Sequence, residues 1–177
     1  RVSERYGGMK VTKLDFVEAA TDEQLHRLAD LANEIWHEFF PGIITEEQID
    51  YMLEKFQSFD AMKRQIAEEG YHYKMLFVDG VPLGYFGICK KPDGSLLLSK
   101  LYLKSSARGK GLASIMWKEI KHLARQEGCE IIWLTVNKGN THAINVYKHN
   151  GMRVIREECT DIGSGFVMDD YVFAFYV

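Results

Sequence analysis

The residues with the clearest chemical meaning form a glycine-rich turn, Arg108-Gly-Lys-Gly111-Leu-Ala113. An apolar segment with strand character, Leu96 to Lys104, precedes the turn, and apolar residues at helical spacing follow it as far as Gly128. The first N–H groups of a helix have no partner inside the helix, and they carry the positive end of its dipole. Glycines at positions 109 and 111 place no Cβ in the path of a ligand. The turn is therefore predicted to bind a phosphate group.

Two common phosphate-binding loops do not fit this turn. A Walker loop has its lysine directly after the second glycine, whereas Lys110 lies between Gly109 and Gly111. A dinucleotide-binding loop needs a third glycine three residues after Gly111, and Ser114 stands there. The pattern that fits is Arg/Gln-x-x-Gly-x-Gly/Ala.

A second pattern follows further along the chain. The β-branched, apolar run Glu130 to Val136 predicts a strand. Thr141 to His149 is predicted to be a helix, with Asn140 as its N-cap and Asn150-Gly151 as its end. The spacing is Val-x-x-x-Asn-x-x-Ala-x-x-x-Tyr-x-x-x-Gly-Met.

In this order, the two patterns resemble the core of the GNAT-type N-acetyltransferases. The resemblance covers roughly Tyr71 to Val177 well and the helical N-terminal third in outline, and it implies acetyl-CoA as the cofactor. It also implies that the strand Leu96 to Lys104 pairs its backbone with the pantetheine arm, and that N–H groups near Leu101 to Leu103 polarise the thioester oxygen. The implied cofactor-binding residues are Leu101, Tyr102, Leu103, Arg108, Gly109, Lys110, Gly111, Leu112, Ala113, Ser114 and Asn140.

Acetyl transfer also needs a proton for the departing thiolate. By position on its helix, Tyr147 matches the family's tyrosine whose hydroxyl lies near the cofactor sulfur, which makes Tyr147 the candidate general acid. Its spacing from Ala143 and Ile144 is equally that of a packed core residue, because a buried tyrosine commonly packs and forms one hydrogen bond. Both roles stay open from the sequence.

The amine must lose a proton, either to a carboxylate or to a chain of waters. Asp169 and Asp170 lie in the last strand pair and must point to opposite faces, so at most one of them faces a site; solvated edge charges are the alternative. Trp36, His37 and Tyr51, together with Phe39 and Phe40, come from the helical region that in this family covers the acceptor. His37 would be a base or an ordinary packed or surface residue. Lys100 and Tyr102 would border the reacting carbon, with surface exposure the simpler expectation for Lys100.

Other local signals define the remaining elements. Capping boxes open two helices, at Thr21-Asp-Glu-Gln24 and at Thr45-Glu-Glu-Gln48, the second with Ile49, Met52, Leu53 and Phe56 on one face. The other predicted elements are a strand over 10–17, a helix over 59–68, strands over 71–78 and 82–90 joined at Asp79-Gly80, and strands over 153–159 and 166–176 with a turn at 163–165. This order predicts a single α/β domain, GNAT-like, with a mixed central sheet of about six to seven strands flanked by helices. We expect the domain to cover residues 9–177 and residues 1–8 to be an expression remnant or an unstructured lead.

Composition limits the partners. The chain has 177 residues, with 22 Lys and Arg against 25 Asp and Glu, so no basic surface for nucleic acid or membrane is expected. Cys89, Cys129 and Cys159 are too widely spaced for a zinc site or a redox pair, which favours buried thiols in a reducing compartment and no metal. Without an apolar run of about 20 residues, a cytoplasmic protein is expected. The sequence leaves a homodimer open.

The predicted function is acetyl-CoA-dependent N-acetylation of a primary amine on a small, cationic molecule. The resemblance is closest to the bacterial branch that includes diamine and polyamine acetyltransferases, although no motif fixes that substrate. Two alternatives remain. One is a protein N-terminal or lysine acetyltransferase, and the other is a non-catalytic acyl-CoA-binding regulatory module.

Overall fold

The computed structural model describes residues 4–6, 9–11 and 13–177, with side chains from Lys13 onward. The strands are β1 (Glu4–Tyr6), β2 (Met9–Val11), β3 (Leu14–Glu18), β4 (Tyr71–Val78), β5 (Val81–Lys90), β6 (Leu96–Leu103), β7 (Ile131–Asn137), β8 (Arg153–Gly163) and β9 (Phe166–Tyr176). The helices are α1 (Asp22–Phe39), α2 (Glu46–Met52), the π-helix η1 (Leu53–Gln57), α3 (Phe59–Glu69), the 3₁₀ turn η2 (Ser105–Ala107), α4 (Leu112–Gln126) and α5 (Thr141–His149).

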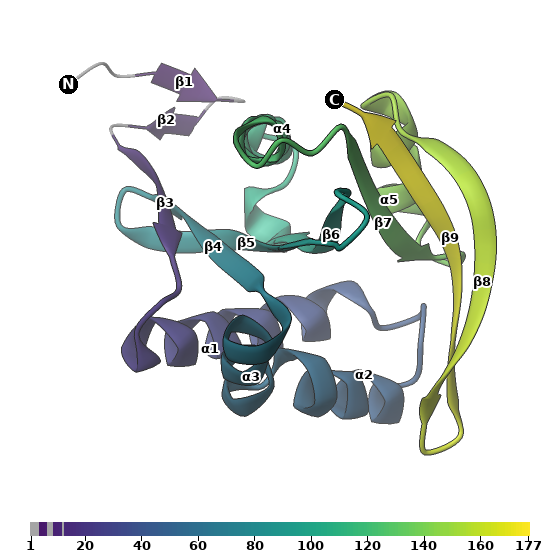
Figure 1. Ribbon diagram of the computed structural model, residues 1–177. Coiled ribbons are helices and arrows are strands. Elements are labelled where there is room, and N and C mark those ends of the chain that lie inside the picture. Colours follow the sequence, from purple (N-terminus) through teal and green to yellow (C-terminus); the bar gives the residue numbers. More distant parts are fainter. Residues whose placement is uncertain (1–3, 7–8, 12) are drawn as a thin grey trace. The chain divides into compact units, whose positions relative to one another are not determined.

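Seven strands form one mixed sheet in the order β3-β4-β5-β6-β7-β9-β8 (Figure 1). The pairs β3–β4, β4–β5, β7–β9 and β8–β9 are antiparallel, and β6–β7 is parallel. The predicted α/β class and mixed sheet are therefore confirmed. The strand predicted over residues 10–17 is wrong as one element, because β2 pairs with β1 in a separate two-stranded sheet and β3 begins again at Leu14. Part of the segment that we expected to precede the fold, Glu4–Tyr6, thus forms strand pairs.

The chain divides into two compact parts, residues 1–89 with 100–120, and residues 90–99 with 121–177. In the first part, α1 begins with the predicted capping box: the Thr21 hydroxyl accepts from the Gln24 N–H, and the Gln24 side chain accepts from the Thr21 N–H. Leu28 and Ile35, fully buried, lie on its inner face. Each such side chain contributes about 1.5–3 kcal/mol on burial.

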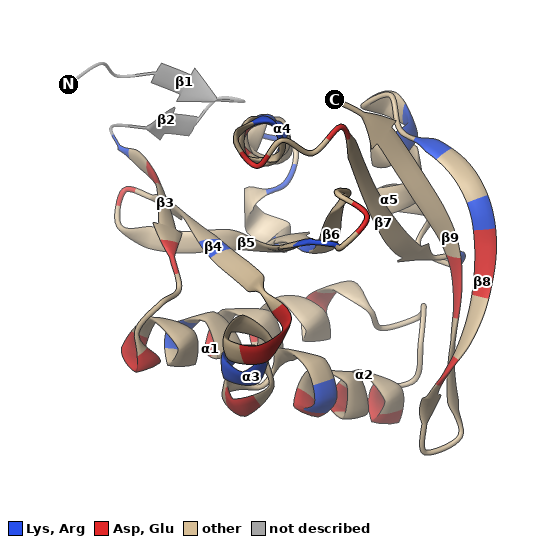
Figure 2. Cartoon of the chain, in the orientation of Figure 1, with Lys and Arg blue, Asp and Glu red and all other residues tan. Residues whose placement is uncertain are grey.

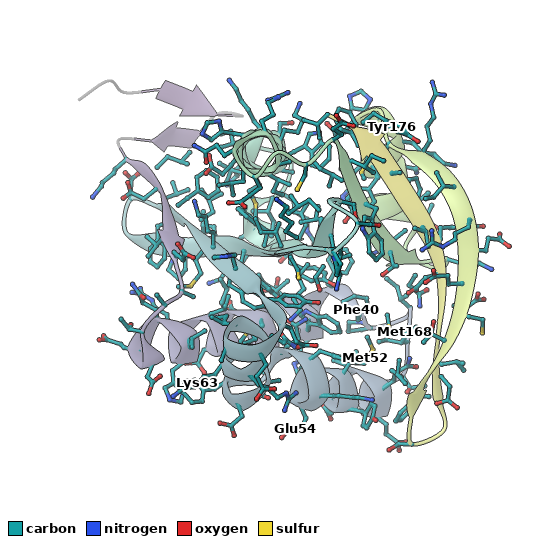
Figure 3. The ribbon with its side chains drawn as sticks, viewed as in Figure 1. Phe40, Met52, Glu54, Lys63, Met168 and Tyr176 are labelled. Carbon is teal, nitrogen blue, oxygen red and sulfur yellow. The ribbon has the colours of Figure 1, made fainter. Side chains whose placement is uncertain are left out.

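At the second predicted capping box, the Thr45 hydroxyl accepts from the Gln48 N–H and caps the start of α2. The helix that it opens does not continue regularly, because α2 ends at Met52 and the chain widens into the π-helix η1. Met52 is buried, as is Phe40 at the end of α1, while Glu54 on η1 points to solvent (Figure 3). The five-residue turn brings Gln57 and the Phe56 carbonyl to buried polar partners.

The predicted turn at Asp79-Gly80 joins β4 to β5, with φ of 49° and 81° at its two residues. Positive φ at both central positions matches the twist of the flanking strands. Next to it, the Asp79 carboxylate accepts from the Lys13 N–H at 2.8 Å, and the Asp79 N–H donates to the Lys13 carbonyl. The turn therefore also fixes the start of β3.

In the second part, β7, β9 and β8 form a continuous antiparallel ladder. The β8 strand continues to Gly163, beyond the predicted end at Cys159, because it pairs with β9 as far as Phe166. This strand carries both basic and acidic residues (Figure 2). Cys89 and Cys129 are buried as expected, whereas Cys159 is exposed on this edge strand and contradicts the expectation of buried thiols.

Among the described residues, no helix has both the length and the apolar character needed to cross a membrane.

Candidate functional site

The glycine-rich turn has the conformation that its residue types predict. Gly109 and Gly111 have φ of 73° and 78°, the left-handed region that L side chains rarely adopt. A Cβ added at either position would meet no protein atom within 4 Å, so the turn is open on that side. Because α4 begins at Leu112, the N–H groups of Leu112, Ala113 and Ser114 have no acceptor inside the helix. Leu112 itself is buried and anchors the first turn of α4.

Three contacts tie this turn to the end of α1. The Lys104 ammonium lies 3.2 Å from the Glu34 carboxylate, and the Ser105 N–H donates to Glu38 at 3.0 Å. The Arg108 guanidinium lies 4.5 Å from the centre of the Phe39 ring. The Arg108 side chain thus packs against Phe39. An anion at this turn would therefore meet the backbone N–H groups rather than the Arg108 guanidinium. The start of the loop is therefore held in place before a ligand arrives.

The end of β6 packs closely against β5. A Cβ at Gly84 would lie 2.7 Å from the Tyr102 carbonyl oxygen and 2.7 Å from the Leu103 side chain, so only glycine permits this approach. The Lys104 N–H donates to the Leu83 carbonyl at 2.8 Å. Leu101 is half-buried and Leu103 is buried. Strand β6 pairs in parallel with β7 at Leu96–Ile132 and Leu97–Trp133.

An aromatic cluster surrounds Tyr102. Its ring lies 5.5 Å from Trp36, 5.9 Å from Phe39, 6.1 Å from Phe40 and 5.5 Å from Tyr85, between ring centres. Trp36 is buried, and its indole N–H donates to the Tyr85 hydroxyl at 3.0 Å. Three of the residues predicted to cover an acceptor, Trp36, Phe39 and Phe40, therefore come together around Tyr102 of β6. The hydrogen bond to Tyr85 fixes the orientation of the buried Trp36 ring.

His37 does not suit the role of a free base. Its Nδ1 lies 2.8 Å from the Asn33 carbonyl oxygen, and its Nε2 lies 3.1 Å from the Asp50 carboxylate. The carbonyl and then Asp50 raise the pKa of His37, since both partners accept hydrogen bonds from the imidazolium. The structure places His37 as a link between α1 and α2. Tyr51 lies on α2, half-buried, with the Lys55 ammonium 3.4 Å from its hydroxyl.

Lys100 contradicts the expectation of surface exposure. Only 6% of the residue is exposed, and its ammonium contacts the Phe56 carbonyl, Gln65 and Tyr73. Burial lowers the pKa of Lys100 to about 7. Gln57, Gln65 and Tyr73 did not figure in the sequence interpretation. The signal in the sequence was that Lys100 and Ser99 interrupt an apolar run, Leu96–Leu103, and such a run is typical of a strand buried on both faces.

In the second part, Asn140 is buried, and its side-chain oxygen accepts from the Ala143 N–H at 3.2 Å. This confirms its predicted role as the N-cap of α5 and leaves the amide NH₂ for another partner. Tyr147, on the same helix, is half-buried with its ring 5.9 Å from that of Phe173. Burial raises the pKa of Tyr147 to about 12, and among the described residues none forms a hydrogen bond with its hydroxyl. The tyrosine is therefore packed, with its proton in place and its hydroxyl available.

Asp169 and Asp170 diverge, as strand geometry requires. Asp169 is exposed and lies 2.9 Å from the Lys138 ammonium. Asp170 is only 5% exposed, and no ion pair joins it to any of the residues that the structure describes. Burial and then the neighbouring charges of Asp169 and Glu158 raise the pKa of Asp170 to about 6. Of the two carboxylates, Asp170 is thus the buried one, and it forms no ion pair with the described residues.

Comparison with known proteins decides the family. A model of the acetyltransferase (GNAT) family matches residues 26–152. The chain belongs to this family. A spermidine N(1)-acetyltransferase of Thermoplasma acidophilum is 26% identical over 151 residues, which cover 83% of this chain and 91% of that protein. A spermine/spermidine N(1)-acetyltransferase of Bacillus subtilis is 31% identical over 97 residues, 49% of this chain and 64% of the relative.

Solved structures show the same GNAT fold. A PaiA N-acetyltransferase from Thermoplasma acidophilum in complex with coenzyme A has a TM-score of 0.77 at 20% identity, with 94% of this chain and 100% of that chain covered. The putative acetyltransferase YncA from Salmonella typhimurium with acetyl-CoA has a TM-score of 0.63 at 15% identity, with 93% and 94% covered.

This GNAT protein is an acetyl-CoA-dependent N-acetyltransferase. Its loop fits the ligand, because positive-φ glycines, an open side and unpaired helix N–H groups are what a pyrophosphate needs. Because the family model and the named relatives are N-acetyltransferases, the non-catalytic module considered from the sequence is set aside.

Proposed function

We propose that this chain moves the acetyl group of acetyl-CoA to a primary amine of a small, cationic acceptor, and that residues 9–177 act as one catalytic domain. The observation that carries the acceptor class is Asp170, a buried carboxylate that no described cation pairs with. A protonated second amine would gain a charge-assisted hydrogen bond there. Relatives that are named as spermidine and spermine acetyltransferases support the same class.

Acetyl-CoA supplies the acetyl group as a thioester when it is bound. The backbone of Arg108–Ser114 would hold the pyrophosphate, and the amide NH₂ of Asn140 would donate to the cofactor. N–H groups of Leu101–Leu103 would donate to the thioester oxygen, where negative charge develops. The acceptor nitrogen attacks the carbonyl carbon, its N–C bond forms as the C–S bond breaks, and the nitrogen releases a proton to water. The Tyr147 hydroxyl donates toward the leaving sulfur.

The high pKa of Tyr147 defines what this hydroxyl can do. A thiol has a pKa near 8.5, so complete proton transfer from a phenol of pKa about 12 to a thiolate is uphill. The hydroxyl can still stabilise the thiolate by a charge-assisted hydrogen bond while water completes protonation. Tyr147 therefore acts in this proposal as a hydrogen-bond donor to the leaving group, a narrower role than a full general acid.

The test compares two adjacent carboxylates. Asp170→Asn should raise KM for a diamine about tenfold more than KM for a monoamine of equal length, whereas Asp169→Asn should have little effect because Asp169 already pairs with Lys138. The preference of the wild type for the diamine should fall as pH drops through about 6, since protonation removes the Asp170 charge. Equal KM changes for both amines in Asp170→Asn would contradict a cation-binding role.

The acceptor class needs a direct screen as well. Polyamines, amino acids, aminoglycosides and peptides should be offered with acetyl-CoA, and released thiol should be measured. Turnover confined to polyamines and related small diamines supports the proposal. Turnover confined to peptides would instead establish the protein N-terminal or lysine acetyltransferase.

A further inference from the structure

The first part of the chain contains a buried lysine, Lys100. The Lys100 ammonium donates to the Phe56 carbonyl at 2.8 Å and to the Gln65 side-chain oxygen at 3.1 Å, and it hydrogen-bonds to the Tyr73 hydroxyl. Among the described residues, no acid forms an ion pair with it. Burying a charged group costs free energy unless each of its donors is satisfied, and here all three are.

The partners of Lys100 are themselves held in place. The Tyr73 ring packs on Gly87, where an added Cβ would lie 2.6 Å from a ring carbon. Gln65 also donates its Nε2 to the Phe56 carbonyl at 3.1 Å. The Phe56 carbonyl therefore accepts two hydrogen bonds, from β6 and from α3. Carbonyls at a helix end otherwise lack partners inside the helix.

Gln57, the residue that follows Phe56, is held by a second set of buried hydrogen bonds. The Tyr85 hydroxyl donates to the Gln57 side-chain oxygen at 3.0 Å and accepts from the Trp36 indole at 3.0 Å. Gln57 is 3% exposed. The last two residues of η1 are thus tied to β4, β5, β6, α1 and α3 by buried polar groups.

We propose that Lys100 is a positioning residue: through the Phe56 carbonyl it holds the π-helical turn Leu53–Gln57 in one arrangement and so sets the place of the preceding helix α2 and of Tyr51. This inference rests on the proposed function, together with the expectation from the family resemblance that the helical region containing Tyr51 covers the acceptor. An apolar side chain in place of Lys100 would fill the volume but would define no single position for the turn. π-helical turns are frequent at functional sites.

The experiment compares Lys100→Met with Lys74→Met. Lys74 lies on β4, half-buried, and its ammonium is 3.4 Å from the carboxylate of Glu119 on α4, so its variant removes a lysine of the same sheet that is paired with α4. In Lys100→Met, backbone hydrogen exchange over residues 53–57 should speed up on the order of tenfold, and acceptor KM should rise on the order of tenfold. The acetyl-CoA Kd should stay within about twofold, because the cofactor loop is held by other contacts. Lys74→Met should leave the hydrogen exchange over residues 53–57, the acceptor KM and the acetyl-CoA Kd unchanged.

A milder variant covers the case in which Lys100→Met does not fold. Tyr73→Phe removes one partner of Lys100 with little change of volume, and it should speed exchange over residues 53–57 in the same direction by a smaller factor. Unchanged exchange and unchanged acceptor KM in the folded variants would overturn the inference. If the wild type acetylates no amine in the screen, the proposed function fails, while hydrogen exchange still decides whether Lys100 holds the turn.

Discussion

At the scale of single residues, the structure shows that the two roles left open for Tyr147 are compatible. Its ring packs against Phe173, and among the described residues none forms a hydrogen bond with its hydroxyl. Tyr147→Phe keeps the packing and removes the hydrogen bond to the leaving sulfur. Turnover should fall on the order of 10²-fold with acetyl-CoA affinity nearly unchanged.

The pH dependence of that loss discriminates further. Because the pKa of Tyr147 is about 12, the hydroxyl stays protonated across the working range, and the ratio of wild-type to variant turnover should stay constant between pH 7 and pH 10. A ratio that collapses above pH 8 would contradict a protonated donor, and wild-type turnover in the variant would contradict any chemical role.

Lys100 gives a stability prediction with a definite sign. Burial lowers its pKa to about 7 in the folded protein, whereas an unfolded lysine titrates near 10.4. Between these values the unfolded chain binds the extra proton, so the free energy of unfolding rises with pH, by up to about 1.4 kcal/mol per pH unit. From pH 7 to pH 9, the free energy of unfolding of the wild type should therefore increase relative to that of Lys100→Met. Urea unfolding of both proteins at the two pH values measures this difference.

The groups that face the Lys100 cluster are Tyr71 and Tyr73 from β4, Glu69 at the end of α3 and Cys89 from β5. They are present in both proteins, so their own titration largely cancels in the comparison. A difference between wild type and Lys100→Met that is independent of pH would mean that the lysine stays charged when folded.

At the scale of elements, the glycine turn and α1 form one functional unit. Glu38 lies in the last turn of α1, where the helix dipole disfavours an acid, yet its carboxylate accepts from the Ser105 N–H. Glu34, one turn earlier, pairs with Lys104 in the same way. The end of α1 therefore positions the phosphate loop on one side, and through the His37–Asp50 contact it positions α2 on the other.

The turn itself can be tested against a matched glycine. Gly111→Ala adds a Cβ at φ 78° on the open side of the loop, and Gly70→Ala adds one at φ 75° after α3, also with no atom within 4 Å. Both variants should lose a similar stability, about 1 kcal/mol, because the backbone strain is the same. Only Gly111→Ala should weaken acetyl-CoA binding, by tenfold or more in calorimetry. Equal affinities in the two variants would remove the loop from the cofactor site.

At the scale of the whole molecule, the sequence predicted best where signals are local. Asn140 and Gly151 mark the two ends of α5, and Asp79-Gly80 forms the turn of the β4–β5 hairpin. These features were predictable because caps and turns depend on a few adjacent residues. The π-helical turn and the burial of Lys100 depend on residues 35 and 44 positions apart, which no local pattern connects. Of the candidate site, the open, positive-φ conformation of the glycine turn was predictable, whereas which of Asp169 and Asp170 is buried required the strand pairing.

Binding of acetyl-CoA should be visible in the stability of the whole chain. A ligand at 100 times its Kd that binds only the folded state adds about 2.7 kcal/mol. For a protein of 177 residues, about 2–4 °C per kcal/mol converts this to a rise in Tm of about 5 to 10 °C. Thermal unfolding with and without acetyl-CoA measures it. Tyr147→Phe should keep the full rise because it leaves binding intact, and Gly111→Ala should lose most of it at the same ligand concentration. A full rise in Gly111→Ala would show that the ligand binds elsewhere, and a lost rise in Tyr147→Phe would make Tyr147 a binding residue and remove its assigned part in the chemistry.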